Sequence, residues 1–302
     1  MTDFNPPSKD TLFAIRALSG IDRILQIARF NDFDTDVIEQ VLEEAGKFAA
    51  DVLAPINIPG DQSGARVEDG SVVSSPGFAG AYQQFMDNGW QSLEVAPQYD
   101  GMGMPGIVAA AAMDYWQAAC LSFSLAPMLT GGAITAIDAH GTDALKALLL
   151  PKMSNGAWTG TMNLTEPQAG SDLSVVATRA VPDGDLYRLT GSKIFITWGD
   201  QEFTENVIHL VLARLPDAPE GVRGLSLFAV PKFLINDDGS IGERNDVFVA
   251  GLEHKLGIHA SPTCVMAFGE QQGAVAYLVG EENKGLACMF TMMNHARISV
   301  GI

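Results

Sequence analysis

The residues from Thr161 to Asp172 combine small, hydroxyl and helix-breaking side chains in a pattern that could bind a ligand. Pro167 lacks a backbone donor and Gly170 permits unusual dihedral angles, so the loop can turn and present free N–H groups together with the Ser171 hydroxyl. Such groups can bind the polar edge of a flat ligand while apolar neighbours contact its faces. The same residue types also form ordinary tight turns, so this loop alone does not establish a site.

A second segment with binding chemistry follows the predicted strand Lys193–Ile196. Thr197 and Trp198 come directly after that strand, about 25 residues beyond the first loop. In a purely structural role, the tryptophan would cover the core and the threonine would bond backbone groups. Two such segments in one region favour a shared ligand, which is a hypothesis at this point.

The first half of the chain is predicted to be helical, because apolar residues recur there at helical spacing. Gly141 should end one helix and Thr142 should cap the next. Residues 54–80 are rich in Pro, Gly and Ser and are predicted to form a long connection. An earlier helix, with Asp34 or Thr35 as its N-cap, carries the apolar residues Val37, Ile38, Val41, Leu42 and Ala45.

The pattern changes near Trp158, beyond which short apolar runs separated by turn residues indicate an antiparallel sheet or barrel. Residues 175–181 and 186–190 flank a Pro-Asp-Gly-Asp turn, which predicts a hairpin. Further strands are expected at 207–215 and 225–230. The middle of the chain is therefore predicted to be all-β.

The helical period returns after Gly280, and no Gly or Pro stop signal precedes Ile302. An amphipathic helix has to bury its apolar face, so we expect further helices as partners and a third helical domain that is truncated here. The apolar face of this helix comprises Leu286, Met289, Phe290 and Met293.

The predicted fold class is therefore α+β. Its parts are an N-terminal helical domain at residues 1–157, a middle antiparallel β-barrel-like domain at 158–280, and the first helix of a C-terminal helical bundle at 281–302.

The composition is that of a packed globular protein, with 47% hydrophobic and 18% charged residues in a chain of 302. The net charge of -18 disfavours nucleic acid and anionic membranes as partners. The apolar run at residues 106–113 is too short to span a membrane, and the N-terminus lacks the pattern of a secretory signal. Cys120, Cys264 and Cys288 are too widely spaced for a disulfide framework or a zinc site. We therefore expect a cytoplasmic protein without a metal site.

Several motifs resemble those of the acyl-CoA dehydrogenases, and the resemblance covers nearly the whole chain. The most specific motif is Leu164-Thr165-Glu166-x-x-Ala169-Gly170-Ser171-Asp172. Shorter matches lie at residues 157–160, 193–197 and 253–258. The segments 254–263 and 294–297 look closest to the branch that acts on 3-methylmercaptopropionyl-CoA.

The resemblance implies FAD as the cofactor. The residues that would bind it are Met162, Leu164, Thr165, Gly170 and Ser171 from the first segment and Phe195, Ile196 and Thr197 from the second. By the same resemblance, the residues that would contact the acyl-CoA are Ser171, Asn294 and Arg297. Two departures concern the packing of the flavin ring: Asn163 replaces a usual small residue, and Phe195 stands where many members carry Trp.

The implied reaction is α,β-dehydrogenation of an acyl-CoA thioester to the 2-enoyl-CoA, in which a carboxylate removes the α-proton while the β-hydride passes to the flavin. The acyl group would be 3-methylmercaptopropionyl or another short or medium chain. No position matches the catalytic glutamate of the family, which we expect beyond Ile302. Glu166 and Asp172 are expected to bond loop N–H groups. The resemblance also implies an electron-transferring flavoprotein as acceptor and a homodimer or homotetramer.

Two alternatives stay open. An acyl-CoA oxidase has the same fold and differs mainly in letting oxygen reach the reduced flavin. A non-catalytic flavin- or acyl-CoA-binding protein would explain the missing base. The G-x-G-x-x-G match at residues 101–106 lacks a preceding strand and is expected to be a surface turn.

Overall fold

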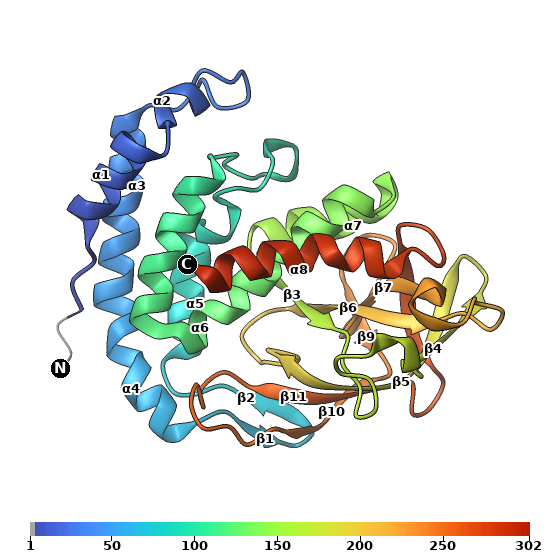
Figure 1. The fold of residues 1–302 in the computed structure, drawn as a ribbon. Helices are drawn as coiled ribbons and strands as arrows, with labels where there is room; N and C mark the ends of the chain where they lie inside the picture. The colour runs from blue at the N-terminus through green and yellow to red at the C-terminus, as the bar shows by residue number, and fades with distance from the viewer. Residues whose placement is uncertain (1–3) are drawn as a thin grey trace.

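The computed structural model of the protein describes residues 4–302. The reading of Met1, Thr2 and Asp3 as part of a signal-free N-terminus lies outside the described residues. Helices form the N-terminal part, a curved sheet forms the middle, and a last helix returns across both (Figure 1). The predicted α+β fold class is confirmed, whereas the proposed domain boundaries remain a prediction.

The N-terminal part begins and ends its helices largely where the sequence predicts. Asp34 caps α3, because its Oδ1 accepts hydrogen bonds from the N–H groups of Asp36 (3.0 Å) and Val37 (2.8 Å). Gly141 follows α6, and the Thr142 hydroxyl accepts the Leu145 N–H at 3.2 Å at the start of α7. The helices are α1 (Ser8–Leu18), α2 (Ile21–Ile24), α3 (Thr35–Phe48), α4 (Ala54–Ser63), α5 (Phe78–Asp87), α6 (Gly106–His140) and α7 (Asp143–Ser154), with short helical turns at Ala49–Leu53, Trp90–Ser92 and Pro97–Tyr99.

The prediction of a long connection at residues 54–80 is wrong. α4 continues α3 through the π-helical turn Ala49–Leu53, and β1 (Arg66–Glu68) pairs with β2 (Ser71–Val73) before α5. Pro55 is the second residue of α4, directly after the π-helical turn that joins this helix to α3. Gly60 lies so close to Phe78 that a Cβ there would be 2.7 Å from the Phe78 Cε2. These residues therefore serve helix geometry and close packing instead of forming a loop.

The central helix of the N-terminal part is α6 (Figure 1). Its most apolar stretch could cross a membrane by length and composition, but 83% of that stretch is buried inside the fold. The run at residues 106–113 is thus the start of a core helix, in which Trp116 and Phe123 are also buried. The helix is bent at Cys120, whose φ of -155° and ψ of 87° are not helical.

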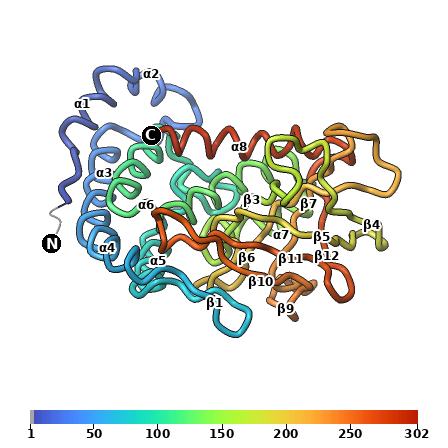
Figure 2. Tube along the Cα trace, turned by 60° about the horizontal axis from the view of Figure 1, so that its bottom comes forward, coloured from blue at the N-terminus to red at the C-terminus, as the bar shows by residue number. Residues whose placement is uncertain are grey.

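The middle part is a curved, barrel-like sheet that does not close (Figure 2). Its main strand order is β10-β11-β5-β12-β7-β6-β3, with β4 paired to β5 and β6. The strands are β3 (Trp158–Asn163), β4 (Arg179–Asp183), β5 (Leu186–Thr197), β6 (Asn206–Arg214), β7 (Leu225–Pro231), β8 (Phe233–Ile235), β9 (Ile241–Arg244), β10 (Val247–Leu252), β11 (Thr263–Phe268) and β12 (Ala274–Val279), with 3-10 turns at Leu173–Val175 and Gly221–Gly224.

The strand pairings match the antiparallel prediction except at two places, the short parallel pairing of β4 with β6 at Arg179 and Arg214 and the pairing of β3 with β6. The hairpin β4–β5 and the pair β6–β7 are antiparallel, as expected. β3 and β6, however, run parallel, with Trp158 opposite Asn206. A parallel pair needs a long crossover, and residues 164–205 provide it. This crossover contains the second predicted binding segment and the first one from Leu164 onward.

The last helix, α8 (Gly285–Gly301), packs along α6 and against the sheet at β7 and β6 (Figures 1 and 2). Gly285 permits the close approach, since a Cβ there would be 2.2 Å from the Ser226 carbonyl carbon. The predicted single apolar face is divided: Met289 is buried in the core, whereas Phe290 is 43% exposed. The side of α8 that carries Phe290 faces the cavity described next.

Candidate functional site

The first binding segment comprises the end of β3 and the loop that follows it, and it forms one side of a cavity; we call residues 161–173 the loop wall. Glu166 and Ala169 exchange backbone hydrogen bonds of 3.0 Å, which closes a tight turn around Pro167. Within residues 4–302, the hydroxyls of Thr165 and Ser171 and the N–H of Ser171 have no hydrogen-bond partner. The loop wall therefore presents the free donors that the sequence predicts.

The second binding segment ends β5 and forms the opposite side; we call residues 194–198 the strand wall. Phe195 has a φ of 61° and Trp198 a φ of 51°, backbone angles that residues other than glycine rarely adopt. The pairing of β11 with β5 shifts register between Cys264 and Met266, beside this turn. The Phe195 side chain is consequently 57% exposed at the cavity.

The rest of the protein holds the strand wall in place. The Trp198 N–H donates to the Pro262 carbonyl at 2.8 Å, and the Trp198 indole donates to the Ser122 carbonyl of α6 at 2.9 Å. The Thr161 hydroxyl donates to the Thr197 carbonyl at 2.7 Å, which joins the strand wall to the loop wall. Strained backbone held by contacts of this kind often marks a ligand site.

The two walls and α8 enclose a cavity of about 560 Å³. Its size lies within the usual range for small-molecule sites. The residues that line it are Met162, Leu164, Thr165, Gly170, Ser171, Asp172, Leu173, Phe195, Ile196, Val222, Leu286, Phe290 and Met293. The predicted cofactor residues are thus brought together, except for Thr197.

Three predicted residues lie outside the lining of this cavity. Thr197 is half-buried beside it, with its carbonyl engaged by Thr161. Asn294 and Arg297 are exposed on α8, just beyond Met293, and the Arg297 guanidinium donates to the Asn294 Oδ1 at 3.0 Å.

Sequence reasoning missed several lining residues as members of the site. Phe290 and Met293 carried a signal, since both belong to the predicted apolar face of the last helix. Val222 carried none, because it comes from the loop between β6 and β7 and is adjacent to the cavity only in the folded chain. Asp172 was identified as a loop residue without a place in the cavity.

Glu166 occupies the scaffold position that the sequence suggests. The N–H groups of Ala177 and Thr178 donate to its carboxylate at 2.7 and 3.1 Å, and the Thr178 hydroxyl donates at 2.5 Å. The Lys193 ammonium lies 2.8 Å from its Oε1. Burial alone would raise the pKa of Glu166, but the Lys193 charge and these hydrogen bonds hold it below the ordinary value. A carboxylate so engaged is a poor proton acceptor.

Asp172 lines the cavity with a carboxylate that is also engaged. Its Oδ1 accepts the Ser174 N–H at 2.9 Å, and hydrogen bonds from Ser174 lower its pKa. Lowered basicity makes Asp172 unsuited to remove a weakly acidic proton. Within residues 4–302, no other carboxylate lines this cavity.

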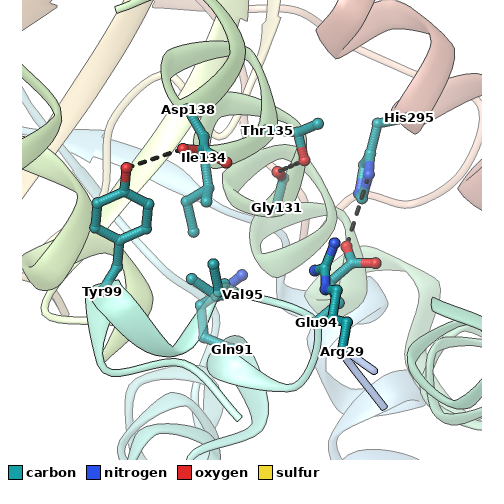
Figure 3. Close-up of a pocket in the computed structure, with 11 residues that line it drawn as sticks. Arg29, Gln91, Glu94, Val95, Tyr99, Gly131, Ile134, Thr135, Asp138 and His295 are labelled. Carbon is teal, nitrogen blue, oxygen red and sulfur yellow. Dashed lines mark hydrogen bonds and ion pairs between the residues drawn. The ribbon is translucent and has the colours of Figure 1, made fainter. Parts of the chain in front are cut away.

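A second cavity, of about 320 Å³, lies on the opposite side of α8 (Figure 3). His295 reaches it, since the two residues from Met293 to His295 rotate a helix by about 200°. At one end the His295 Nδ1 lies 3.7 Å from the Glu94 Oε1, and at the other the Tyr99 hydroxyl donates to Asp138 at 2.9 Å. This cavity has a mixed polar and apolar lining and contains none of the predicted site residues.

Comparisons with known proteins agree with this arrangement. The chain matches the acyl-CoA dehydrogenase N-terminal domain at residues 35–157 and the acyl-CoA dehydrogenase middle domain at residues 161–270. It is 50% identical over 300 residues to a 3-methylmercaptopropionyl-CoA dehydrogenase of Ruegeria pomeroyi, covering 99% of this chain and 50% of that relative. It is 36% identical over 308 residues to a butyryl-CoA dehydrogenase of Syntrophomonas wolfei, covering 97% and 50%.

Among solved structures, butyryl-CoA dehydrogenase from Megasphaera elsdenii has a TM-score of 0.70 and 25% identity, covering 89% of this chain and 64% of that one. The chain spans about half the length of the curated relatives it matches.

Proposed function

The chain belongs to the acyl-CoA dehydrogenase family, and from this premise we propose that it binds FAD and serves the α,β-dehydrogenation of an acyl-CoA thioester. The observation that carries the proposal is the cavity in which the loop wall and the strand wall meet. Segments separated in sequence converge there with free polar groups and apolar faces. Such convergence is the usual form of a cofactor site.

The residues present fit a flavin. Phe195 and Met162 offer apolar surface to the faces of a flat ring, and the Thr165 and Ser171 hydroxyls can bond its polar edge. The bound flavin would supply the hydride acceptor. The N–H of Ser171 also supports a ligand at this place, because this unpaired backbone donor would gain a hydrogen-bond partner when a ligand binds.

The thioester would lie along α8. We propose that Ser171, Asn294 and Arg297 contact its CoA portion, as in the resembled family, with Arg297 as the cation available to a phosphate. Arg297 is exposed and bonded only to Asn294 within residues 4–302, so it can exchange that partner for a ligand. This local positive group matters in a chain whose net charge is -18.

The catalytic base is proposed to come from a residue outside residues 4–302. Glu166 and Asp172 are the carboxylates on the loop wall, and hydrogen bonds lower the pKa of each. A base for this reaction needs a carboxylate that is positioned and free to accept a proton.

The 50% identical relative supports 3-methylmercaptopropionyl-CoA as the acyl substrate, with another short or medium acyl-CoA as the wider class. We further propose an electron-transferring flavoprotein as acceptor, a homodimer or homotetramer, and a cytoplasmic location. The alternative functions are an acyl-CoA oxidase and a non-catalytic binding protein. The test below distinguishes both from the proposed dehydrogenase.

The proposal is tested by adding short acyl-CoA thioesters to the FAD-loaded protein without oxygen and recording the flavin spectrum. We expect a thioester to perturb the spectrum of the bound flavin without bleaching it, because within residues 4–302 Asp172 is the carboxylate that lines the cavity and its pKa is lowered. Bleaching would place the base within the chain. A spectrum that no thioester alters would oppose the acyl-CoA assignment, and rapid oxygen consumption would favour an oxidase.

A further inference from the structure

The middle part contains two buried ion pairs of the same type at different places. Lys193 pairs with Glu166, with side chains 0% and 3% exposed, and Lys232 pairs with Asp200, with side chains 9% and 1% exposed. The first lies behind the cavity. The second pair also does not line the cavity, and its Asp200 accepts the Val72 N–H of β2. Because both pairs are buried but only the first joins the two walls, variants of the two pairs separate the effect of burying an ion pair from the effect of its position.

Lys193 connects the two walls of the cavity. It precedes the strand wall in β5, and its Nζ donates to the Leu164 carbonyl at 2.9 Å and to the Glu166 carboxylate at 2.8 Å, both in the loop wall. The next residue repeats the link, because the Ile194 N–H donates to the Thr165 carbonyl at 2.9 Å. The two cavity-lining residues Leu164 and Thr165 are therefore both held by groups at the base of the strand wall.

Glu166 extends this connection into the loop wall. It accepts hydrogen bonds from residues 177 and 178 and from the Gln168 amide at 2.5 Å. A buried pair of charges pays a desolvation cost, and its net contribution to stability is often small. Unlike apolar side chains, such a pair makes directional hydrogen bonds that fix the positions of its partners.

We propose that Lys193 is a positioning residue that holds the loop wall and the strand wall at the spacing a flavin requires. This inference rests on the proposed function for its ligand. Lys193 does not line the cavity, so it acts through Leu164, Thr165 and Glu166.

The protonation of Lys193 provides a readout specific to this role. Burial lowers the pKa of Lys193 to about 8, while the charge of Glu166 opposes the shift. Its neighbour across the sheet in β11 is the apolar Met266, and within residues 4–302 Glu166 is the charged group that acts on it. Loss of the proton above about pH 8 removes the charge attraction between Lys193 and Glu166 and so weakens the link between the walls.

The test compares matched neutral pairs. One variant carries Lys193→Met with Glu166→Gln, which avoids leaving a buried charge unpaired, and the control carries Lys232→Met with Asp200→Asn. We expect the first variant to weaken FAD binding by at least about tenfold and to change the visible circular dichroism of the bound flavin. The control should retain FAD affinity within about twofold, even if its thermal unfolding midpoint falls equally. Equal loss of affinity in both variants would overturn the proposal.

The pH profile gives the second readout. FAD affinity of the unmodified protein should fall as pH rises from about 7 to 9.5, and that fall should be absent in the variant without Lys193. The control variant should show the same fall as the unmodified protein. Identical profiles with and without Lys193 would contradict a positioning role for its charge.

Hydrogen exchange separates failure of this inference from failure of the proposed function. If the unmodified protein binds no FAD at all, the proposed function fails. The positioning role still predicts that amides of both walls exchange faster in the Lys193→Met, Glu166→Gln variant than in the control variant. Unchanged exchange, or faster exchange in one wall alone, would then reject the link between the walls.

Discussion

Thr165 is the residue at which hydrogen bonding to the cofactor can be measured most simply. It lines the cavity, and its hydroxyl has no partner within residues 4–302. Thr165→Ala should weaken FAD binding by about 1 kcal/mol, which is the usual net value of one hydrogen bond. A titration of FAD followed by its absorbance measures the change. Thr135→Ala on α6 is the control, since Thr135 bonds only Gly131 of its own helix. Unchanged FAD affinity in Thr165→Ala would remove Thr165 from the site.

His209 makes stability depend on pH through burial. Burial lowers its pKa to about 3, and the nearby charges of Lys232 and Arg244 act in the same direction. The unfolded chain, with an ordinary pKa of about 6.5, binds the proton that the folded protein excludes. The free energy of unfolding should therefore decrease as pH falls from about 6.5 toward 3.

Urea unfolding at several pH values tests this dependence. His209→Asn should show a shallower decrease between about pH 6.5 and 5 than the unmodified protein. His254→Asn is the control, because His254 is exposed, and it should leave the decrease unchanged. If the His209 variant lost stability with pH as steeply as the control, burial of this histidine would not be the cause.

At the same scale, the sequence predicted residues whose chemistry is local. Thr165, Gly170 and Ser171 could be identified because one short loop contains them all. Val222 could not, because its place in the cavity depends on how a distant loop folds back. The role of Lys193 was also hidden, since a lysine in a strand gives no sign that it is fully buried.

At the scale of elements, the fit of β3 onto α6 depends on Gly160. A Cβ at this position would lie 2.5 Å from the Ala133 Cβ and 2.9 Å from the Met153 Cε. Gly160→Ala should therefore destabilise the protein by about 1–3 kcal/mol through overpacking. Because β3 leads into the loop wall, FAD affinity should also decline.

Urea unfolding measures the effect, and Gly251→Ala in β10 provides the matched control. No atom lies within 4 Å of a Cβ built at Gly251, so this change should leave the free energy of unfolding nearly unaltered. Equal stability of the two variants would mean that β3 can move away from α6 without cost.

The elements also show where sequence patterns mislead. Residues 54–80 resemble a loop in composition, but Pro55 and Gly60 fit a helix start and a close contact. The parallel pairing of β3 with β6 could not be predicted, because short alternating strands carry no information on direction. Helix caps such as Asp34 and Thr142 were predictable, since capping depends on adjacent residues alone.

At the scale of the whole molecule, the cavity leaves Phe195 of the strand wall 57% exposed. Family members, by the resemblance, complete the FAD site with a neighbouring subunit. We therefore predict that the 302-residue chain binds FAD reversibly and loses it during gel filtration in buffer without FAD. The ratio of flavin to protein absorbance in the eluted peak measures retention, and a run with FAD in the buffer is the control. Retention of one FAD per chain would contradict this prediction.

The central claim is that the loop wall and the strand wall together form a flavin site, and a visible absorbance titration of FAD with the purified chain tests it most directly. The account predicts a saturable change, with a shifted and better resolved flavin band as the ring leaves water for the cavity beside Phe195 and Met162. A spectrum that stays that of free FAD at every protein concentration would contradict it.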